Sequence, residues 1–156
     1  MGHPAVATVG TIVVEPSQVN VVPGLAKFTV DTRHPDPARR GELITQIGDL
    51  SKKIASERNL GVEIKTLRDR PPVNLSPRVG DVLRRAAVTA GIEPREMTSG
   101  AGHDAQVLTA AANAGMLFVP SIGGRSHCPE EATAAEDVVL GTRVLATALR
   151  ELAYQT

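Results

Sequence analysis

The first third of the chain carries two segments with the pattern of β-strands. Ala5–Glu15 is rich in β-branched residues and predicts a strand, and Pro23-Gly24 predicts a turn after it. Ala26–Arg33 then alternates. One face of this segment would carry Ala26, Phe28, Val30 and Thr32, and the other Lys27, Thr29, Asp31 and Arg33. We therefore predict a hairpin with one buried face and one polar face.

A helix and a third strand are predicted next. Ala38–Arg58 has apolar residues at helical spacing, and Asp36-Pro37 before it combines a good N-cap with proline at the first helical position. Val62–Leu67 alternates again and predicts a strand. Residues 1–72 are thus expected to form a β-β-α-β unit, an antiparallel sheet with a helix on one face.

The pattern changes beyond Pro71-Pro72, where helices and strands are expected to alternate as in an open α/β sheet. The expected elements are a helix over Arg78–Ala90, a short strand near Glu96–Thr98, a helix from His103 to Asn113, an apolar strand over Met116–Pro120 and a helix over Ala134–Ala153. The fold class is therefore α/β, or α+β overall. We predict two domains, residues 1–72 and residues 73–156.

Composition excludes several classes of function. Seventeen basic residues balance 17 acidic ones, so no face is obliged to meet a polyanion, and with no Trp, one Tyr and two Phe there are few platforms for base stacking. We expect no nucleic-acid partner. The one cysteine, Cys128, cannot form an internal disulfide, and no apolar run is long enough to span a membrane. These features indicate a cytoplasmic protein with no membrane partner.

The loop Ser99–Asp104 is the first candidate for chemistry. Its glycines allow the backbone to approach a ligand, and His103-Asp104 offers an acid/base or orienting pair at the start of a predicted helix. Alternatively, the loop is a tight turn in which Asp104 binds first-turn amides. The spacing alone does not choose between the two interpretations.

The second candidate is the Gly-rich loop Pro120–Glu131, which follows the predicted apolar strand. Ligands gather at the carboxyl ends of strands in open α/β sheets, so His127 could bind a metal with a nearby carboxylate as its partner. Alternatively, this is a surface loop whose Glu130-Glu131 favours the start of the last helix. A nucleophilic pair of His127 and Cys128 is disfavoured, because adjacent residues in one loop seldom point at each other.

Five segments together resemble a known family. In order they are Val19–Gly24, Asp31–Pro35, Pro71–Val73, Ser99–Ala105 and Ser126–Glu131. They resemble the C-terminal part of the hydantoinase/carbamoylase branch of the aminoacylase-like dinuclear metallohydrolases. That branch includes N-carbamoyl-L-amino-acid hydrolases and allantoate amidohydrolases. The resemblance covers essentially the whole chain.

The resemblance implies roles for five residues. Asn20 and Arg33 fall where the family binds the substrate carboxylate, from a ferredoxin-like lid domain that also dimerises. Gly102 falls where a backbone group touches the substrate, with His103 beside it. His127 falls on the last ligand of a site for two divalent ions, zinc or manganese. Residues 73–156 would then be the C-terminal segment of the catalytic domain.

The family's other metal ligands and its general-base Glu are expected upstream of the region that this chain resembles. A catalytic zinc takes about three protein ligands, so we expect the isolated chain to be inactive. The resemblance implies a homodimeric hydrolase of a small carbamoyl or ureido acid. The alternatives are a non-catalytic, truncated dimerisation fragment and a peptidase of the same superfamily.

Overall fold

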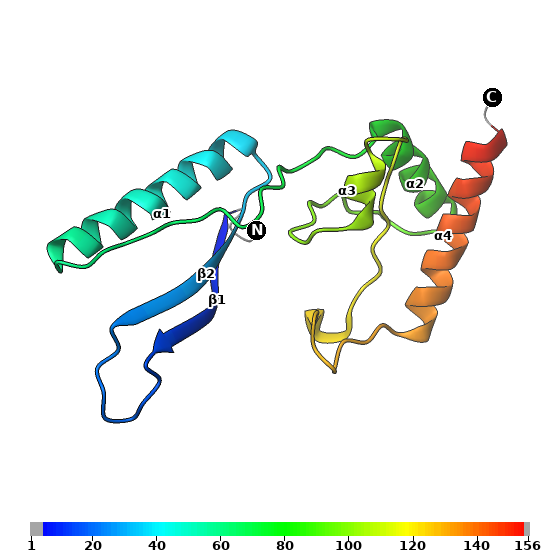
Figure 1. Ribbon diagram of the computed structural model, residues 1–156. Coiled ribbons are helices and arrows are strands. Elements are labelled where there is room, and N and C mark those ends of the chain that lie inside the picture. Colours follow the sequence, from blue (N-terminus) through cyan, green and yellow to red (C-terminus); the bar gives the residue numbers. More distant parts are fainter. Residues whose placement is uncertain (1–4, 155–156) are drawn as a thin grey trace. The chain divides into compact units, whose positions relative to one another are not determined.

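The computed structural model describes residues 5–154, and the chain divides into two compact units, residues 1–72 and residues 73–156 (Figure 1). Over the described residues, the first unit contains the sheet and one α-helix, and the second contains the other helices. The mixed content of helix and strand confirms the predicted fold class. No helix among residues 5–154 is both long and apolar enough to cross a membrane.

The first unit begins with an antiparallel hairpin. Strand β1 spans Val6–Glu15 and β2 spans Leu25–Arg33, with a register shift between Val9 and Thr11. The loop between the strands closes where the Gly24 N–H donates to the Glu15 carbonyl at 2.9 Å. The two predicted strands are confirmed. The turn, however, falls at residues 19–20 rather than at Pro23-Gly24.

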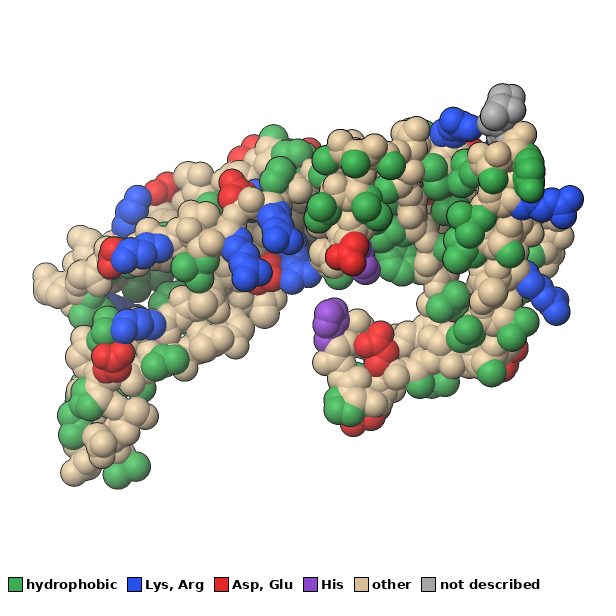
Figure 2. All heavy atoms as spheres, turned by 45° about the vertical axis from the view of Figure 1, so that its right-hand side comes forward, with side chains coloured by type: hydrophobic (Ala, Val, Ile, Leu, Met, Phe, Trp, Pro, Cys, Tyr) green, Lys and Arg blue, Asp and Glu red, His purple; other side chains and the backbone are tan. Residues whose placement is uncertain are grey.

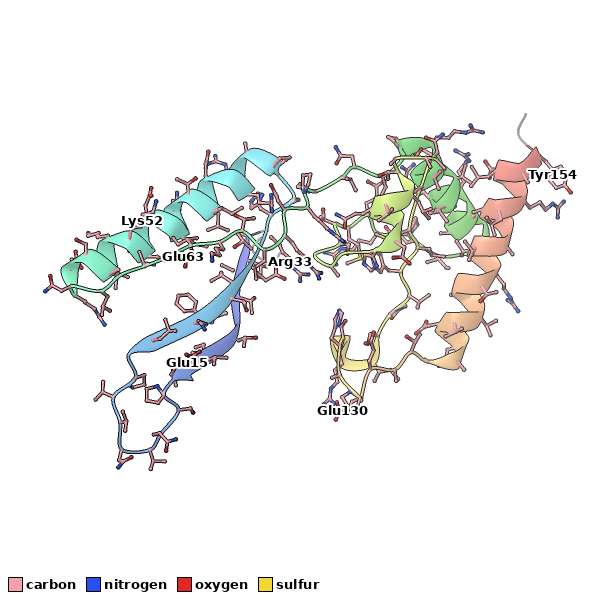
Figure 3. All side chains as sticks on the ribbon, viewed as in Figure 1. Glu15, Arg33, Lys52, Glu63, Glu130 and Tyr154 are labelled. Atoms are coloured by element: carbon pink, nitrogen blue, oxygen red, sulfur yellow. The ribbon has the colours of Figure 1, made fainter. Side chains whose placement is uncertain are left out.

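The predicted polar face of the hairpin carries ion pairs, whereas the predicted buried face remains largely open. Lys27 Nζ lies 2.9 Å from the Glu15 carboxylate, near the end of β1 that adjoins the hairpin loop (Figure 3). On the other face Val30 is half-buried, but Phe28 is 57% exposed. The expectation of a buried face is therefore wrong for most of β2, because α1 contacts only part of this strand.

Helix α1, Pro37–Glu57, begins and ends with recognisable caps. Asp36 Oδ1 accepts hydrogen bonds from the backbone N–H groups of Ala38 and Arg39 at 2.8 and 3.1 Å, as the sequence predicts. At the other end Asn59 takes a left-handed conformation, φ 54°. The Leu60 N–H then donates to the Ala55 carbonyl at 2.8 Å, so the helix ends in a Schellman motif.

The third strand of the predicted β-β-α-β unit is absent from the part of the chain that the structure describes. Residues 60–72 run back along α1 without joining the sheet, which has two strands (Figure 1). A strand needs a neighbour that pairs with its backbone groups, and alternation alone does not supply one. The segment is tied to α1 by side chains instead, with Arg40 and Asp69 2.7 Å apart.

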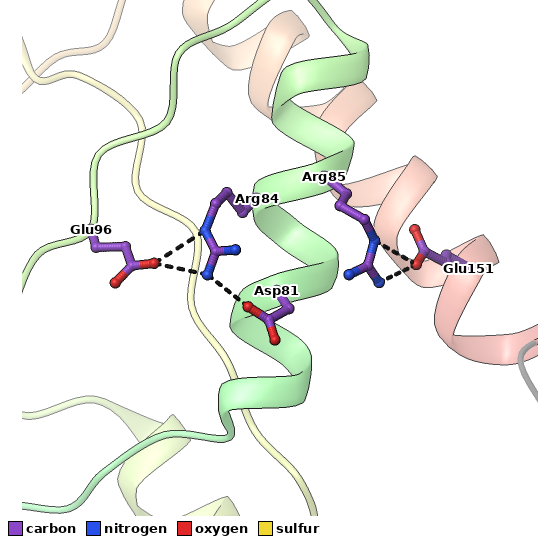
Figure 4. A network of polar contacts seen from close by, with 5 residues as sticks. All are labelled: Asp81, Arg84, Arg85, Glu96 and Glu151. Carbon is purple, nitrogen blue, oxygen red and sulfur yellow. Dashed lines mark hydrogen bonds and ion pairs between the residues drawn. The ribbon is translucent and has the colours of Figure 1, made fainter.

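The second unit is built on two packed helices, α2 (Pro77–Thr89) and α4 (Ala135–Tyr154). Five of its side chains form a buried cluster between them: Val82, Ala86, Ala87, Val144 and Ala148. Figure 4 shows the ion pairs made by two arginines of α2. Arg85 binds Glu151 across the two helices, and Arg84 binds Asp81 and Glu96 at 2.6 and 2.9 Å.

The strands predicted near residues 96–98 and 116–120 are not formed. The segment around Gly115 packs on the helices instead. A Cβ on Gly115 would lie 2.4 Å from Val79 Cγ1 of α2, and one on Gly141 of α4 would lie 2.5 Å from Val119 Cγ1. No other described segment pairs with this backbone, so no ladder forms beside it.

The helix predicted from His103 to Asn113 is shorter than expected. Helix α3 spans Asp104–Leu108, and turns continue the chain beyond it. The N–H groups of Ala111 and Ala112 both donate to the Leu108 carbonyl at 2.9 Å. The two predicted long helices, α2 and α4, differ from their expected bounds by one residue at each end.

Apolar side chains are widely exposed over the described residues. Val19 and Val22, in the hairpin loop, are fully or almost fully open to solvent, and Leu145 and Leu149 of α4 are about half exposed. Figure 2 shows hydrophobic side chains spread over much of the visible surface rather than confined to the interior.

Candidate functional site

The candidate residues lie on both units. Asn20 and Arg33 belong to the hairpin of the first unit, whereas Gly102, His103 and His127 belong to two loops of the second unit.

Arg33, the last residue of β2, is held by a carboxylate on its own strand. Its Nε and Nη2 donate to the two Asp31 oxygens at 2.9 and 2.6 Å, a bidentate pair on the polar face of the hairpin. This hydrogen bond lowers the pKa of Asp31 from its usual value, against a smaller opposing effect of burial, and raises the pKa of Arg33. Arg33 therefore stays cationic, and a ligand carboxylate there would compete with Asp31.

Asn20 lies in the turn of the hairpin loop and is exposed. It is placed by the hairpin that the sequence predicts, at the end of the hairpin remote from Arg33, because Arg33 pairs with Val6 at the opening of the ladder. The ladder runs from the Val6–Arg33 pair to the Glu15–Leu25 pair. Because each strand residue adds about 3.3 Å, the two ends of the ladder lie far apart. Within the first unit, these two residues do not meet at one site.

The loop before α3 holds His103 in a defined orientation. His103 Nε2 lies 2.9 Å from Ser99 Oγ, and its ring meets the Phe118 ring edge-on at a centroid distance of 5.8 Å. His103 is the N-cap residue of α3, but its side chain makes no capping hydrogen bond. Asp104 is the first residue of the helix. The loop therefore holds the imidazole in one orientation, and its contact with a ligand stays a prediction.

His127 lies in a compact loop between the 3₁₀ turn η1 (Ile122–Gly124) and α4. The Ile122 N–H donates to the Ala132 carbonyl at 2.8 Å and closes the loop. Glu131 accepts a hydrogen bond from the His127 backbone N–H at 2.9 Å. The Glu130 carboxylate, labelled in Figure 3, lies 4.0 Å from Arg125.

The His127 side chain is exposed and starts from a strained backbone. Its φ of 59° lies in the left-handed region, which residues with a side chain seldom occupy. Such outliers gather at functional sites, where the surrounding structure maintains them. The Glu131 hydrogen bond is one contact that maintains this one.

The described residues do not complete a metal centre. Over residues 5–154 no three His, Cys, Asp or Glu side chains come together in a way that could hold an ion. A catalytic zinc takes about three protein ligands. His127 could supply one ligand, and the described part of the chain does not supply the rest.

Two partners of these candidates were not anticipated from the sequence. Strand alternation puts Asp31 on the same polar face as Arg33, but it does not by itself predict that the two side chains bind each other. Ser99 belongs to the segment Ser99–Ala105, but the sequence alone assigns it no role. Its contact with His103 spans a loop of irregular backbone, and no spacing rule predicts such a contact.

Comparisons with known proteins give the family. The family described as "Peptidase family M20/M25/M40" matches residues 2–151. The allantoate amidohydrolase of Escherichia coli K12 is 37% identical over 155 residues, which are 99% of this chain and 38% of that protein. The N-carbamoyl-L-amino-acid amidohydrolase of Paenarthrobacter aurescens is 37% identical over 147 residues, which are 94% of this chain and 36% of that protein.

A solved structure agrees. A hydantoinase/carbamoylase-family amidase from Burkholderia multivorans superposes with a TM-score of 0.86 at 36% identity, covering 96% of this chain and 36% of that one. The chain thus spans somewhat more than a third of the length of these relatives. It belongs to peptidase family M20/M25/M40, and the resemblance drawn from its five segments is confirmed.

Proposed function

We propose that this chain is part of a metal-dependent amidohydrolase that cleaves a C–N bond of a linear carbamoyl or ureido acid. The candidate substrates are N-carbamoyl-L-amino acids and allantoate. The observation that carries the proposal is the 37% identity to an allantoate amidohydrolase over 99% of the chain. The two units would be part of a lid and dimerisation domain, residues 1–72, and part of a catalytic domain, residues 73–156.

The proposed roles follow the chemistry of each group. Arg33 would hold the substrate carboxylate, since its planar guanidinium already binds the Asp31 carboxylate bidentately. Asn20 lies at the other end of the hairpin, so it would add an amide donor to that carboxylate from a second copy of the chain in the proposed homodimer. The Gly102 backbone and the His103 ring would meet the carbamoyl or ureido group.

Proteins of this family are generally metal-dependent. Two divalent ions, zinc or manganese, would polarise the scissile group and activate water. His127 would provide one ligand. The other ligands and the general base would come from polypeptide beyond the region that the relatives share with this chain, since that region is 38% of the E. coli protein.

A chimaera tests the proposal. This chain would replace its 155-residue counterpart in the E. coli allantoate amidohydrolase, and ammonia release from allantoate and N-carbamoyl amino acids would be measured with zinc or manganese added. We expect turnover of at least one substrate. A control chimaera would carry the corresponding region of the Paenarthrobacter relative. An inactive test chimaera beside an active control would contradict the proposal.

Two variants of the active chimaera would test the roles of single residues. Arg33→Lys removes bidentate binding, so kcat/KM should fall about 10- to 100-fold, the loss expected for one charge-assisted hydrogen bond. The matched control is Arg39→Lys, because Arg39 also binds a carboxylate in the first unit, that of Glu42 at 2.9 Å. Equal losses in both variants would argue against a substrate contact at Arg33.

His127→Ala should abolish metal-dependent turnover, with Ser126→Ala as the control in the same loop. The decisive second measurement is the metal content of the two variants. If His127→Ala retained the metal content of the control, then His127 would not be a ligand.

A peptidase is the second candidate, because the matching family is described as a peptidase family. Assaying the same chimaera on dipeptides would separate the two activities. Hydrolysis of dipeptides without hydrolysis of carbamoyl or ureido acids would replace the first proposal with this one.

For the isolated chain we propose a non-catalytic state that self-associates as a homodimer in the cytoplasm. The described residues hold no group of three metal-binding side chains, and both strands of the hairpin have an unpaired edge in the described sheet. Light scattering and metal analysis of the purified chain test this. A monomer with stoichiometric zinc would contradict it.

A further inference from the structure

The hydroxyl of Ser99 makes three polar contacts within one loop. Its Oγ lies 2.9 Å from His103 Nε2, 3.1 Å from the Ala101 nitrogen and 3.2 Å from the Ala101 carbonyl oxygen. Ser99 is half-buried, whereas His103 is exposed. The half-buried serine hydroxyl thus holds the exposed imidazole in place.

The capacity of a hydroxyl limits how these contacts can be satisfied. A serine hydroxyl offers one hydrogen and two lone pairs. The Ala101 N–H must donate, so it takes one lone pair. If the hydroxyl hydrogen goes to the Ala101 carbonyl, the remaining lone pair can accept a hydrogen from His103 Nε2. This is the arrangement in which all three contacts are hydrogen bonds.

This arrangement selects one form of the neutral ring. Nε2 carries the hydrogen, so Nδ1 carries the lone pair. Among the described residues no partner binds Nδ1 of His103. Phe118 contacts the same ring edge-on, at an interplanar angle of 69°, and restricts its rotation. The exposed edge of the ring is therefore a hydrogen-bond acceptor with a set direction.

We propose that Ser99 is a positioning residue that fixes His103 in the Nε2–H form, so that Nδ1 accepts an N–H of the substrate. This inference rests on the proposed function for the identity of the substrate. Carbamoyl and ureido groups carry N–H donors on the nitrogen atoms beside the scissile bond. An acceptor at Nδ1 matches such a donor, whereas an ester or a plain carboxylic acid offers none at that position.

The tautomer is measured directly, without turnover. Long-range ¹H–¹⁵N spectra of the full chain, recorded above about pH 8 where an unperturbed imidazole is neutral, distinguish a protonated Nε2 from a protonated Nδ1. We expect the ratio of the Nε2–H to the Nδ1–H form of His103 to exceed that of free histidine by about five- to tenfold, the bias that one net hydrogen bond supplies. Dominance of the Nδ1–H form in the wild-type chain would overturn the proposal.

Variants test whether Ser99 is the cause. Ser99→Ala should bring the tautomer ratio of His103 close to that of free histidine, and Ser99→Thr, which keeps a hydroxyl, should restore the bias. His34 is an internal control, because its Nδ1 accepts the Asp36 N–H at 2.9 Å and does not depend on Ser99. An unchanged His103 ratio in a Ser99→Ala variant with an unchanged His34 signal would overturn the proposal. If that variant does not fold, the wild-type ratio decides.

The contact with the substrate is tested in the active chimaera. Ser99→Ala should raise KM for the carbamoyl or ureido substrate several-fold with a smaller change in kcat, and Ser99→Thr should recover most of the loss. An unaltered KM would refute the role in binding even if the tautomer is as expected. An inactive chimaera with the expected tautomer would count against the proposed function and leave the positioning by Ser99 intact.

Discussion

The two units of this chain are stabilised by different means. The second unit contains five of the six buried apolar side chains of the described residues, all between α2 and α4, whereas the first contains one, Ala55. The first unit depends on the hairpin ladder, two helix caps and exposed ion pairs. A two-stranded hairpin is marginal by itself in water. The comparison shows that backbone hydrogen bonds can give a segment its shape without giving it much stability.

The largest effect should come from the core of the second unit. Val144→Ala removes the equivalent of two buried methylene groups from a side chain that is 1% exposed, which should cost about 2–3 kcal/mol, including the cavity. Hydrogen exchange should show lower protection in α2 and α4 and unchanged protection in α1. Leu149→Ala, on an exposed position of α4, is the control. An equal loss in α1 would mean that the two units unfold as one.

Gly115→Ala should have the next largest effect. Its new Cβ would meet the stiff, β-branched Val79 at 2.4 Å, so overpacking should cost about 1–3 kcal/mol. Gly80→Ala in α2 is the matched control, since nothing lies within 4 Å of its Cβ. This control should stabilise the helix by about 0.5–1 kcal/mol. Urea unfolding followed by circular dichroism measures whether each substitution lowers or raises the free energy of unfolding. An increase for Gly115→Ala would contradict the close packing.

A smaller, pH-dependent effect is expected in the first unit at Asp36. Backbone N–H donors from Arg39 and Ala38 lower the pKa of this carboxyl below its usual value. Its contribution is therefore present above the unfolded pKa and is lost as the pH falls through the folded pKa. Protection of α1 should decrease below about pH 4.

Asp36→Asn provides the matched comparison, because asparagine caps helices about as well as aspartate and does not titrate in this range. It should keep α1 near its wild-type protection at neutral pH and remove most of the acid dependence. If the acid dependence persisted unchanged in this variant, then groups other than Asp36 would be responsible.

The smallest effect should come from the ion pair between Arg40 and Asp69, which joins α1 to the returning segment. Asp69 is 68% exposed, so a double-mutant cycle with alanine should give a coupling of about 0.2–1 kcal/mol. It should fall further at high salt. A coupling energy well above this range would show that this ion pair stabilises the first unit more than the exposure of Asp69 indicates.

The sequence predicted the elements whose signals are local. The Asp36 cap, the bounds of α1 to within one residue at each end and the extended backbone of β2 each depend on neighbouring residues, and each is present in the structure. The three strands that are missing, near residues 62–67, 96–98 and 116–120, depend on partners elsewhere. Their alternation or apolar character is real, but no other segment of the described chain pairs with them.

The candidate site divides in the same way. The residue types at positions 33, 103 and 127 were identified from sequence motifs, yet their contacts with Asp31, Ser99 and Glu131 appear only in the folded chain. Asp31 and Arg33 share a face of β2, as strand alternation implies, but the contacts of His103 and His127 span four residues of irregular backbone and depend on the dihedral angles of each intervening residue. Sequence periodicity carries no information about those angles.

The left-handed backbone at His127 makes this position unfavourable for a residue with a side chain. Glycine would adopt φ 59° without penalty, so a histidine there carries a conformational cost that its loop must offset. Replacement by glycine should relax the loop, and replacement by alanine should leave most of the cost in place. The difference in loop stability between the glycine and alanine variants measures the free-energy cost of a side chain at this position.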